Sequence, residues 1–298
     1  MQILRGRTTG IDSLAISPDS RYVAVCGLEG YHVWDLYDLE LKARAIFKDS
    51  VALARLQFTS ATSLFARGAR HWSRHDLATG ADSAPRLPGR VRSHNDILHP
   101  TRRLLKAVSR NDNVETFRVT DSGFDWVGSA VPIPHPYLMG FDPAGERYLV
   151  GVKVDDLSGH SWQLSDTATD TLIVSLQLTP SSWLGRESCH FSPDGRRLYV
   201  FGEDHLRVFN CDMGGPPGVQ AEIPSGDYTF ELAVHPDGRV LVTVENEREV
   251  TFRDAEMLQV IRTYDFNMPK VTCVAFTPDG TRCVVGNSRG KVLLFDVE

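Results

Sequence analysis

The sequence lacks the features that mark several large classes of protein. No apolar run approaches the roughly 18 residues of a membrane-spanning helix. The glycine patterns that cradle phosphates, G-x-x-x-x-G-K-S/T and G-x-G-x-x-G, do not occur. No strongly amphipathic helical stretch is evident. We therefore expect no membrane contact, no phosphate-cradling nucleotide site and no cofactor.

Cysteine is also scarce, with five residues among 298 and no C-x-x-C pair. All lie in apolar runs that we interpret as strands: Cys26, Cys189, Cys211, Cys273 and Cys283. Their expected state is a small, buried, reduced thiol. The first residues, Met1–Arg7, lack the apolar run of a secretory signal. Both observations predict a cytoplasmic protein.

Basic residues are outnumbered by acidic ones. The chain has 32 lysines and arginines against 38 aspartates and glutamates, which gives a net charge of −6. Domains that bind nucleic acid are normally basic, so this balance argues against general binding of DNA or RNA. Hydrophobic residues make up 42% and charged residues 23%, as expected of a globular protein with an apolar core.

What the sequence has instead is a repeat: an apolar run, a turn of the type Ser-Pro-Asp-Gly, and a second apolar run. Four copies are clear: Ile16–Ser20, Phe191–Gly195, Val234–Gly238 and Phe276–Gly280. Phe141–Gly145 is an altered copy, and Phe58–Ser60 and Leu98–Pro100 are degenerate copies. The turn proline or its equivalent stands at positions 18, 60, 100, 143, 193, 236 and 278. Most intervals fall at 40 to 43 residues, the period of a four-stranded propeller blade.

The turn residues have a physical reason. Proline fixes φ near −65° at the second position of a type I turn, and glycine takes the left-handed conformation that follows. Such turns join the two strands of a hairpin. Each copy is therefore interpreted as a strand, a hairpin turn and a second strand, such as Tyr22–Cys26 or Val240–Val244.

The first strands carry apolar residues at adjacent positions, as in Leu14, Ala15 and Ile16. Since neighbouring residues of a strand point to opposite faces, both faces of each sheet must be buried. Blades stacked side by side meet this requirement. The prediction is an all-β chain whose residues 1–298 form a single domain, a seven-bladed β-propeller of four-stranded antiparallel blades.

The seventh repeat shows only three strands, whereas an additional strand-like segment precedes the first repeat. Pairing of residues 2–7 with residues 291–297 would supply the missing strand. We therefore expect the N-terminal strand to close the last blade, which protects sheet edges.

The repeats resemble those of the WD-repeat family along essentially the whole chain. Trp34-Asp35 is one literal Trp-Asp pair, and Phe209-Asn210, Arg253-Asp254 and Phe295-Asp296 are diluted versions. The segment Phe191–Asn210 is also similar to lactonase-type propeller repeats. The WD-repeat resemblance implies a non-catalytic scaffold. It would bind protein or peptide partners on the loops around a central channel, as a monomer within a larger assembly.

Patterns that would carry catalysis are weak. Gly286–Gly290 matches G-x-S-x-G, but its flanks are strands, so a hairpin loop is expected instead of a nucleophile elbow. His71 and His75 are four residues apart, about 13 Å on an extended strand, which is too far for a shared metal. We expect no catalytic residue and no metal site.

The loops around the predicted channel hold aromatic and basic residues, the types enriched in binding hot spots. The candidate partner-binding residues are Arg92, Arg110, Tyr137, Trp183, Arg186, Tyr228, Lys270 and Arg289. The alternative is a propeller enzyme such as a lactonase, with a polar site at the channel mouth. Its candidate acids are Glu187, Glu203, Asp227 and Glu231. A module that works only inside an assembly, with no ligand of its own, is the third possibility.

Overall fold

The chain divides into two compact units. Met1–Pro85 and Gly226–Glu298 form the first, here called the terminal unit, and Arg86–Ser225 forms the second, the central unit. The computed structural model describes residues 2–5, 10–27, 29–46, 55–67, 72–85, 91–99, 103–120, 123–129, 132–133, 135–153, 160–177, 188–201, 205–211, 219–224 and 231–297. The prediction of a single domain over 1–298 stays a prediction.

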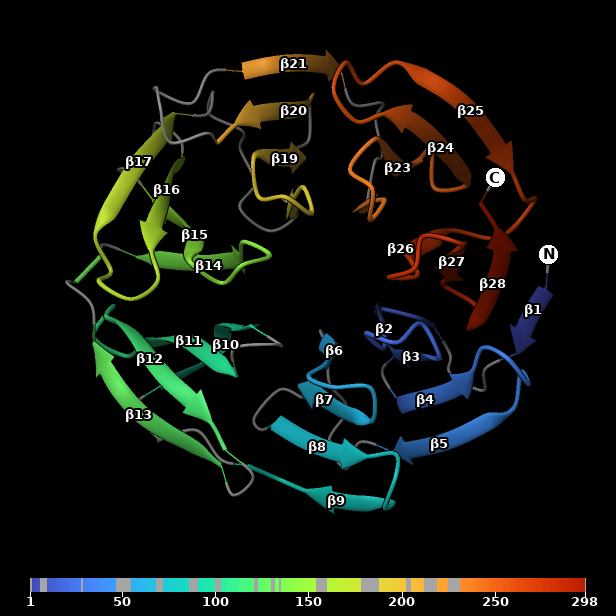
Figure 1. Cartoon of the computed structure of the whole chain (residues 1–298), viewed down its shortest axis with the longest axis horizontal. Helices are drawn as coiled ribbons and strands as arrows, with labels where there is room; N and C mark the ends of the chain where they lie inside the picture. Colours follow the sequence, from blue (N-terminus) through green and yellow to red (C-terminus); the bar gives the residue numbers. More distant parts are fainter. Residues whose placement is uncertain are drawn as a thin grey trace. The chain divides into compact units, whose positions relative to one another are not determined.

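The terminal unit contains four sheets, each of four antiparallel strands (Figure 1). The first two are β2 (Ser13–Ile16), β3 (Tyr22–Gly27), β4 (Gly30–Asp35) and β5 (Leu41–Ile46), then β6 (Arg55–Phe58), β7 (Ser63–Arg67), β8 (Trp72–Asp76) and β9 (Ala81–Ser83). The other two are β22 (Glu231–Val234), β23 (Val240–Glu245), β24 (Glu249–Asp254) and β25 (Val260–Asp265), then β26 (Val271–Phe276), β27 (Arg282–Asn287), β28 (Lys291–Asp296) and β1 (Gln2–Arg5).

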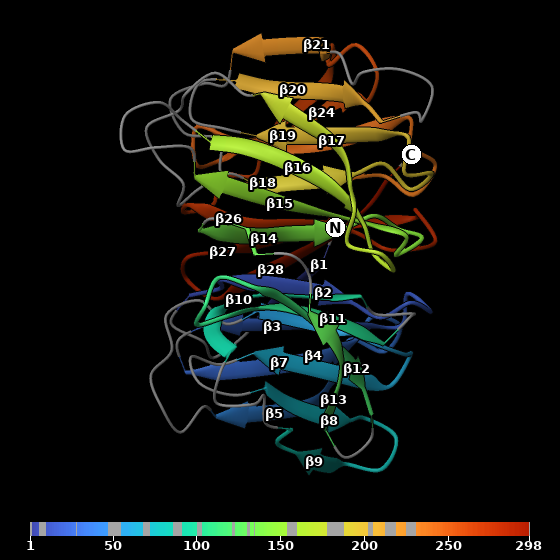
Figure 2. The ribbon, with the colours of Figure 1, turned by 90° about the vertical axis from the view of Figure 1, so that its left-hand side faces the viewer.

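The central unit contains three sheets of the same kind. They are β10 (Val91–His99), β11 (Leu104–Ser109), β12 (Val114–Val119) and β13 (Phe124–Ser129), then β14 (Pro136–Phe141), β15 (Arg147–Lys153), β16 (His160–Asp166) and β17 (Leu172–Gln177), then β18 (Ser188–Phe191), β19 (Arg197–Phe201), β20 (His205–Asn210) and β21 (Val219–Pro224). The strands of a sheet lie side by side in chain order, as β14 to β17 show in Figure 2.

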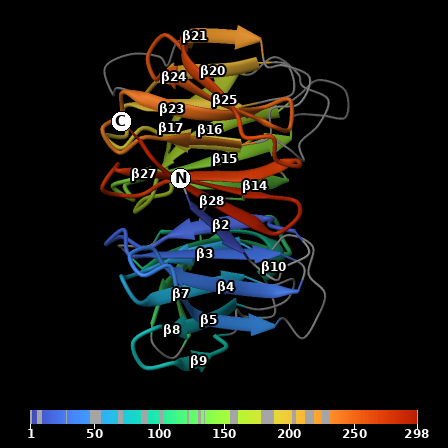
Figure 3. The ribbon, with the colours of Figure 1, turned by 90° about the vertical axis from the view of Figure 1, so that its right-hand side faces the viewer.

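The predicted number and kind of sheets are confirmed: seven antiparallel sheets of four strands, with no helix among the residues described. The predicted closure is confirmed as well. Gln2 pairs with Leu294 and Arg5 pairs with Lys291, so β1 is the fourth strand beside β28 (Figure 3). Residues 6 and 7 of the predicted strand lie outside the described residues.

The hairpin turns have the geometry that their residues predict. Gly195 takes φ 71° and Gly280 takes φ 73°, and the Gly195 N–H donates to the Ser192 carbonyl at 2.8 Å. Ser20 stands where the other copies have glycine and takes φ 60°. At Gly280 a side chain would also collide, because a Cβ there would lie 2.8 Å from the His235 ring. Gly280 is therefore favoured both by the left-handed backbone and by the closeness of the His235 ring.

The degenerate third repeat has the same hairpin register as the clear copies. Leu98 pairs with Leu105, as Phe141 pairs with Tyr148 in the next sheet. The second repeat differs, because Phe58 pairs with Leu64. Its hairpin is one residue shorter than the others, which explains why its turn lacks the usual residues.

The cores of the terminal unit confirm that a sheet buries both faces. On β27, Val285 packs in a cluster with Val244 and Val250 of the preceding sheet. Its neighbour Val284 packs in a different cluster with Val25 of the following sheet. Val284 and Val285 are both fully buried. Burying a valine side chain contributes roughly 1.5–3 kcal/mol, so one strand stabilises two interfaces at once.

The first residue of the hairpin turn is used in two ways. Where it is Ser192 or Thr277, its hydroxyl accepts the N–H of Arg197 or Arg282 at 2.9 and 3.0 Å and closes its own turn. Where it is histidine, the ring reaches the next sheet. His235 Nε2 lies 2.9 Å from the Gly280 carbonyl oxygen, and His99 Nε2 lies 3.3 Å from that of Pro143.

Arginines at the start of the second strand tie neighbouring sheets together in both units. Arg147 Nη1 donates to the Cys211 carbonyl at 3.1 Å, and its Nη2 donates to the Gly195 carbonyl at 2.6 Å. Arg282 Nη1 donates to the Leu36 carbonyl at 2.8 Å. Cys211 and Leu36 both follow the third strand of the next sheet, so the same tie occurs twice.

A buried lysine makes a further tie in the central unit. Lys106 on β11 is fully buried, and its Nζ donates to Thr116 Oγ1 at 2.9 Å and to Asp170. The ammonium also lies 4.3 Å from the centre of the Tyr148 ring. Burial lowers the pKa of Lys106, although Asp170 opposes this effect. The sequence gave no sign of this ion pair.

Removal of residues 1–8 is expected to abolish cooperative thermal unfolding, because the last sheet loses its fourth strand. Two single variants refine the test. Leu4 is 5% exposed and Ile3 is 54% exposed. Leu4→Ala should lower the unfolding free energy by about 2–4 kcal/mol and Ile3→Ala by about 1 kcal/mol or less, measured by denaturant titration. An unchanged melting temperature in the truncated chain would contradict the role of β1.

Lys106→Ala is expected to lower the unfolding free energy by about 3–5 kcal/mol, because it leaves Asp170 without its buried partner. Lys42 is the control, since its Nζ lies 2.7 Å from Asp38 at a position where both side chains are partly exposed. Lys42→Ala should cost far less than Lys106→Ala, because water screens an exposed ion pair. Equal losses in the two variants, measured by denaturant titration, would show that burial does not strengthen the Lys106 pair.

Candidate functional site

Each sheet has two ends that differ in chemistry. At one end, here called the cap edge, the first strand turns into the second and the third turns into the fourth. At the other end, here called the loop edge, the second strand turns into the third and the chain enters the first strand. Of the predicted partner-binding residues, Arg110, Lys270 and Arg289 lie on described segments of the loop edge. The Trp-Asp pair belongs to the cap edge.

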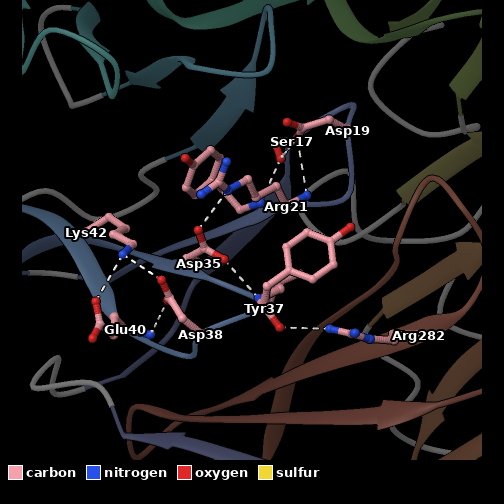
Figure 4. Close-up of polar contacts among 11 residues, drawn as sticks. Ser17, Asp19, Arg21, Asp35, Tyr37, Asp38, Glu40, Lys42 and Arg282 are labelled. Atoms are coloured by element: carbon pink, nitrogen blue, oxygen red, sulfur yellow. Dashed lines mark hydrogen bonds and ion pairs between the residues drawn. The ribbon is translucent and has the colours of Figure 1, made fainter.

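The cap edge of the first sheet is organised by Asp35, which ends β4 with its side chain buried. Arg21 Nε donates to Asp35 Oδ2 at 2.8 Å, and the Tyr37 N–H donates to Oδ1 at 2.9 Å (Figure 4). Burial raises the pKa of the Asp35 carboxyl, but these hydrogen bonds outweigh burial and the pKa lies below its usual range. Asp35 is therefore an ionised turn cap.

Three other sheets repeat this cap. The Oδ1 atoms of Asp76, Asp166 and Asp254 each accept the backbone N–H groups two and three residues further on, at 2.7–3.1 Å. The fourth residue after the aspartate takes a left-handed conformation in all four sheets, with φ 57–70° at Leu39, Gly80, Asp170 and Leu258. Of these four aspartates, the sequence pointed to Asp35 and Asp254 and passed over Asp76 and Asp166.

At the loop edge of the terminal unit, backbone hydrogen bonds link adjacent segments. The Val271 N–H donates to the Glu247 carbonyl at 2.7 Å, and the Ser288 N–H donates to the Lys270 carbonyl at 2.8 Å. Lys270 Nζ also pairs with Glu247 Oε1 at 2.6 Å. Arg289 is exposed on the β27–β28 turn. The structure thus places Lys270 and Arg289 on adjacent segments and adds Glu247, the partner of Lys270. Glu247 lies in the turn equivalent to that of Arg289, and its charge opposite to that of Lys270 is the sequence signal that could have revealed it.

In the central unit, Arg110 is exposed on the β11–β12 turn, as expected for a loop-edge residue. Tyr137 and Arg92 were expected on loops, but they lie inside strands β14 and β10. Tyr137 is half-buried there, and the side chain of Arg92 lies outside what the structure describes. Three further candidates also lie outside the described residues: Trp183, Arg186 and Tyr228.

The described residues contain no group of three or more His, Cys, Asp or Glu side chains that could hold a metal ion. The G-x-S-x-G segment is the predicted hairpin, because Ser288 lies in the turn between β27 and β28. Within the described part of the chain, no helix has the length and apolar character needed to cross a bilayer. The five cysteines are free thiols; Cys189 is half-buried and the others are buried.

One acidic candidate of the enzyme alternative can be placed. Glu231 begins β22, and burial raises its pKa to about 7, although Arg55 opposes the shift. Glu187, Glu203 and Asp227 lie outside the described residues. His190 on β18 is also perturbed, because burial lowers its pKa to about 4 and keeps the ring neutral at pH 7.

Comparison with known proteins identifies the type of repeat. A family model described as WD domain, G-beta repeat, matches residues 1–35 and 258–296, which include β1 to β4 and β26 to β28. The crystal structure of the Cps50 (Swd1) β-propeller domain of Myceliophteria thermophila superposes with a TM-score of 0.76, covering 99% of both chains at 14% identity. This chain is a WD-repeat β-propeller.

Other similarities place the WD-repeat propeller among proteins of different function. Protein groucho of Drosophila melanogaster is 28% identical over 108 residues, which are 35% of this chain and only 14% of that protein. Hydrazine synthase of Kuenenia stuttgartiensis superposes with a TM-score of 0.74 at 12% identity, covering 98% of this chain and 97% of that one. Because the latter is an enzyme by name, the propeller fold does not itself decide function.

Acid titration tests the Asp35 cap of the WD-repeat propeller. The pKa of Asp35 is lowered in the folded protein, so on acidification the unfolded chain takes up the proton first, near an ordinary pKa of about 3.9. The stabilisation is complete above about pH 5 and is lost as the pH falls through the folded pKa. The wild type should therefore lose more unfolding free energy than Asp35→Asn between about pH 5 and 2. Parallel curves would contradict an ionised cap.

Proposed function

We propose that this WD-repeat propeller is a non-catalytic scaffold that binds a protein or peptide partner at its loop edge. The proposed contact residues are Arg92, Arg110, Tyr137, Trp183, Arg186, Tyr228, Lys270 and Arg289. Relatives and structural neighbours of the WD-repeat type support a role in binding. Free thiols, four of them buried, fit a reducing compartment, so we further propose a cytoplasmic protein that works as one copy in a larger assembly.

The observation that carries this proposal is a fixed backbone that presents the exposed side chain of Arg289. The Asn287 Oδ1 atom accepts the N–H groups of Arg289 and Lys291 at 3.0 and 2.9 Å, which sets the turn that holds Arg289. The same turn is tied to Lys270 through Ser288. A surface that is ordered before binding loses little conformational entropy when it binds. Arginine on such a surface can form a strong contact with an acidic or planar group of a partner.

The alternative is a hydrolase of the lactonase type, and Glu231 is the described residue that favours it. A carboxyl whose pKa is near 7 is suited to exchange protons at neutral pH. Glu231→Gln would then abolish lactone hydrolysis. In the scaffold proposal the wild type hydrolyses no member of a lactone panel, with or without added divalent metal.

Affinity purification from the source organism's extract tests the loop edge. The double variant Lys270→Glu/Arg289→Glu is expected not to capture at least one protein that the wild type captures. Its affinity for that protein should fall roughly tenfold or more. The matched control is Lys42→Glu, because Lys42 also pairs with an acid at 2.7 Å but lies near the cap edge of the same unit.

The comparison separates binding from general damage. A thermal melt of each variant checks that all three proteins remain folded to the same extent. If the loop-edge double variant and the control retain the same proteins as the wild type, Lys270 and Arg289 are not contact residues. Loss of the same proteins in the control would attribute the effect to altered net charge and not to the loop edge.

A further inference from the structure

A cleft of about 330 Å³ opens at the cap edge of the central unit, between the sheet β14–β17 and the sheet β18–β21. Its walls are the two hairpin turns after β14 and β18 and the segments that follow β16 and β20. The charged lining residues are Asp142, Glu146, Arg147, Asp166, Asp194 and Arg196. Ala144, Ile173, Pro193 and Cys211 contribute apolar surface. The volume lies near the lower limit for a ligand pocket and suits one long side chain.

One pair of charges in the cleft is already neutralised. Arg147 Nε donates to Asp142 Oδ2 at 2.9 Å, and its two other nitrogens donate to the carbonyls of Cys211 and Gly195. The Asp142 Oδ1 atom accepts the N–H groups of Glu146 and Arg147. The other charged residues of the lining are three acids, Glu146, Asp166 and Asp194, and one base, Arg196. The cleft is therefore negative.

Two of these acids each have one oxygen in use and one without a partner. Asp166 Oδ1 accepts from Thr169, and Asp194 Oδ1 accepts from the Ser192 hydroxyl at 2.5 Å. No described residue donates a hydrogen bond to Oδ2 of either aspartate. The hydrogen bond from the Thr169 N–H lowers the pKa of Asp166, and that from Ser192 lowers the pKa of Asp194. Both are carboxylates at neutral pH, fixed by their turns.

The lining favours an organic cation over a metal ion. No three acidic, histidine or cysteine side chains among the described residues are close enough to share a metal. A guanidinium group is larger, donates several hydrogen bonds in a planar fork, and sits on an aliphatic stem. Ile173, Pro193 and Ala144 offer apolar surface for such a stem, while Asp166 and Asp194 offer free acceptors for its head.

We propose that this cleft binds the arginine side chain of a partner protein's segment. This site lies at the cap edge of the central unit and shares no residue with the proposed loop-edge contacts. It goes beyond the proposed function, and either can fail without the other.

The test uses the whole chain and two short peptides, Ac-Ala-Arg-Ala-NH2 and its citrulline counterpart, which has the same shape without the charge. Titration is followed by the backbone amide resonances of Glu146, Gly195 and Cys211. Millimolar arginine peptide is expected to shift these resonances, and the citrulline peptide is expected to bind about tenfold more weakly, since charge-assisted hydrogen bonds are lost.

The chain supplies matched controls for the two aspartates. Asp254 caps the same kind of turn as Asp166, and Asp279 accepts the Thr277 hydroxyl at 2.6 Å as Asp194 accepts that of Ser192. Asp166→Asn/Asp194→Asn should weaken the arginine peptide about tenfold, whereas Asp254→Asn/Asp279→Asn should not change its affinity. Asparagine keeps the accepting oxygen of each turn but not its charge, so both double variants should stay folded and melt at similar temperatures, somewhat below that of the wild type.

Three results would overturn the proposal. They are absence of shifts at millimolar arginine peptide, equal binding of the citrulline peptide, and equal affinities in the wild type and Asp166→Asn/Asp194→Asn. None of these results bears on the loop edge, which is tested with different variants and a different readout.

Discussion

The structure depends on one constraint, that each sheet must bury both of its faces. On β27, the adjacent residues Val284 and Val285 pack into clusters shared with two different neighbouring sheets. A single four-stranded sheet of this composition cannot shield both faces from water by itself. Each sheet is therefore stable only with its neighbours, and the repeat in the sequence is the direct expression of that requirement.

Polar contacts act where the apolar interfaces end. At the cap edge, hydroxyls and carboxylates close their own turns, and longer side chains such as His235 and Arg282 reach the next sheet. These contacts satisfy carbonyls and N–H groups that the strands leave unpaired. A backbone polar group without a hydrogen bond near a buried interface would cost free energy. The same residues also set the distance between neighbouring turns. The cleft beside Asp166 and Asp194 is a product of this arrangement.

The sequence predicted the fold to a large extent because its signals are local. The turn Ser-Pro-Asp-Gly, the apolar runs and the period of 40–43 residues specify seven sheets without knowledge of any distant contact. The ties between sheets could not be predicted in this way. Lys106 meets Asp170, 64 residues away, and Arg147 meets the carbonyl of Cys211 at the same separation. Only the three-dimensional structure shows which turn lies beside which strand.

The candidate site was predicted less well for a related reason. Loop residues carry no periodic signal, so composition alone suggested Tyr137, which the structure places inside β14. Lys270 and Arg289 lie on adjacent segments of one edge, but their role in binding stays a prediction, and the partner of Lys270, Glu247, was missed. A family resemblance based on Trp-Asp likewise passed over Asp76 and Asp166, where the aspartate remains and the preceding aromatic residue does not.

The pairing of β1 with β28 has a consequence for synthesis on the ribosome. The three sheets between residues 86 and 225 are contiguous in the chain, so they can assemble as soon as that stretch has emerged. The remaining four sheets include strands from both extremes of the sequence, and Gln2 must wait until Leu294 has been made. During that interval β1 has no partner strand and is open to wrong pairings, and this is the period in which the nascent protein most needs protection from aggregation.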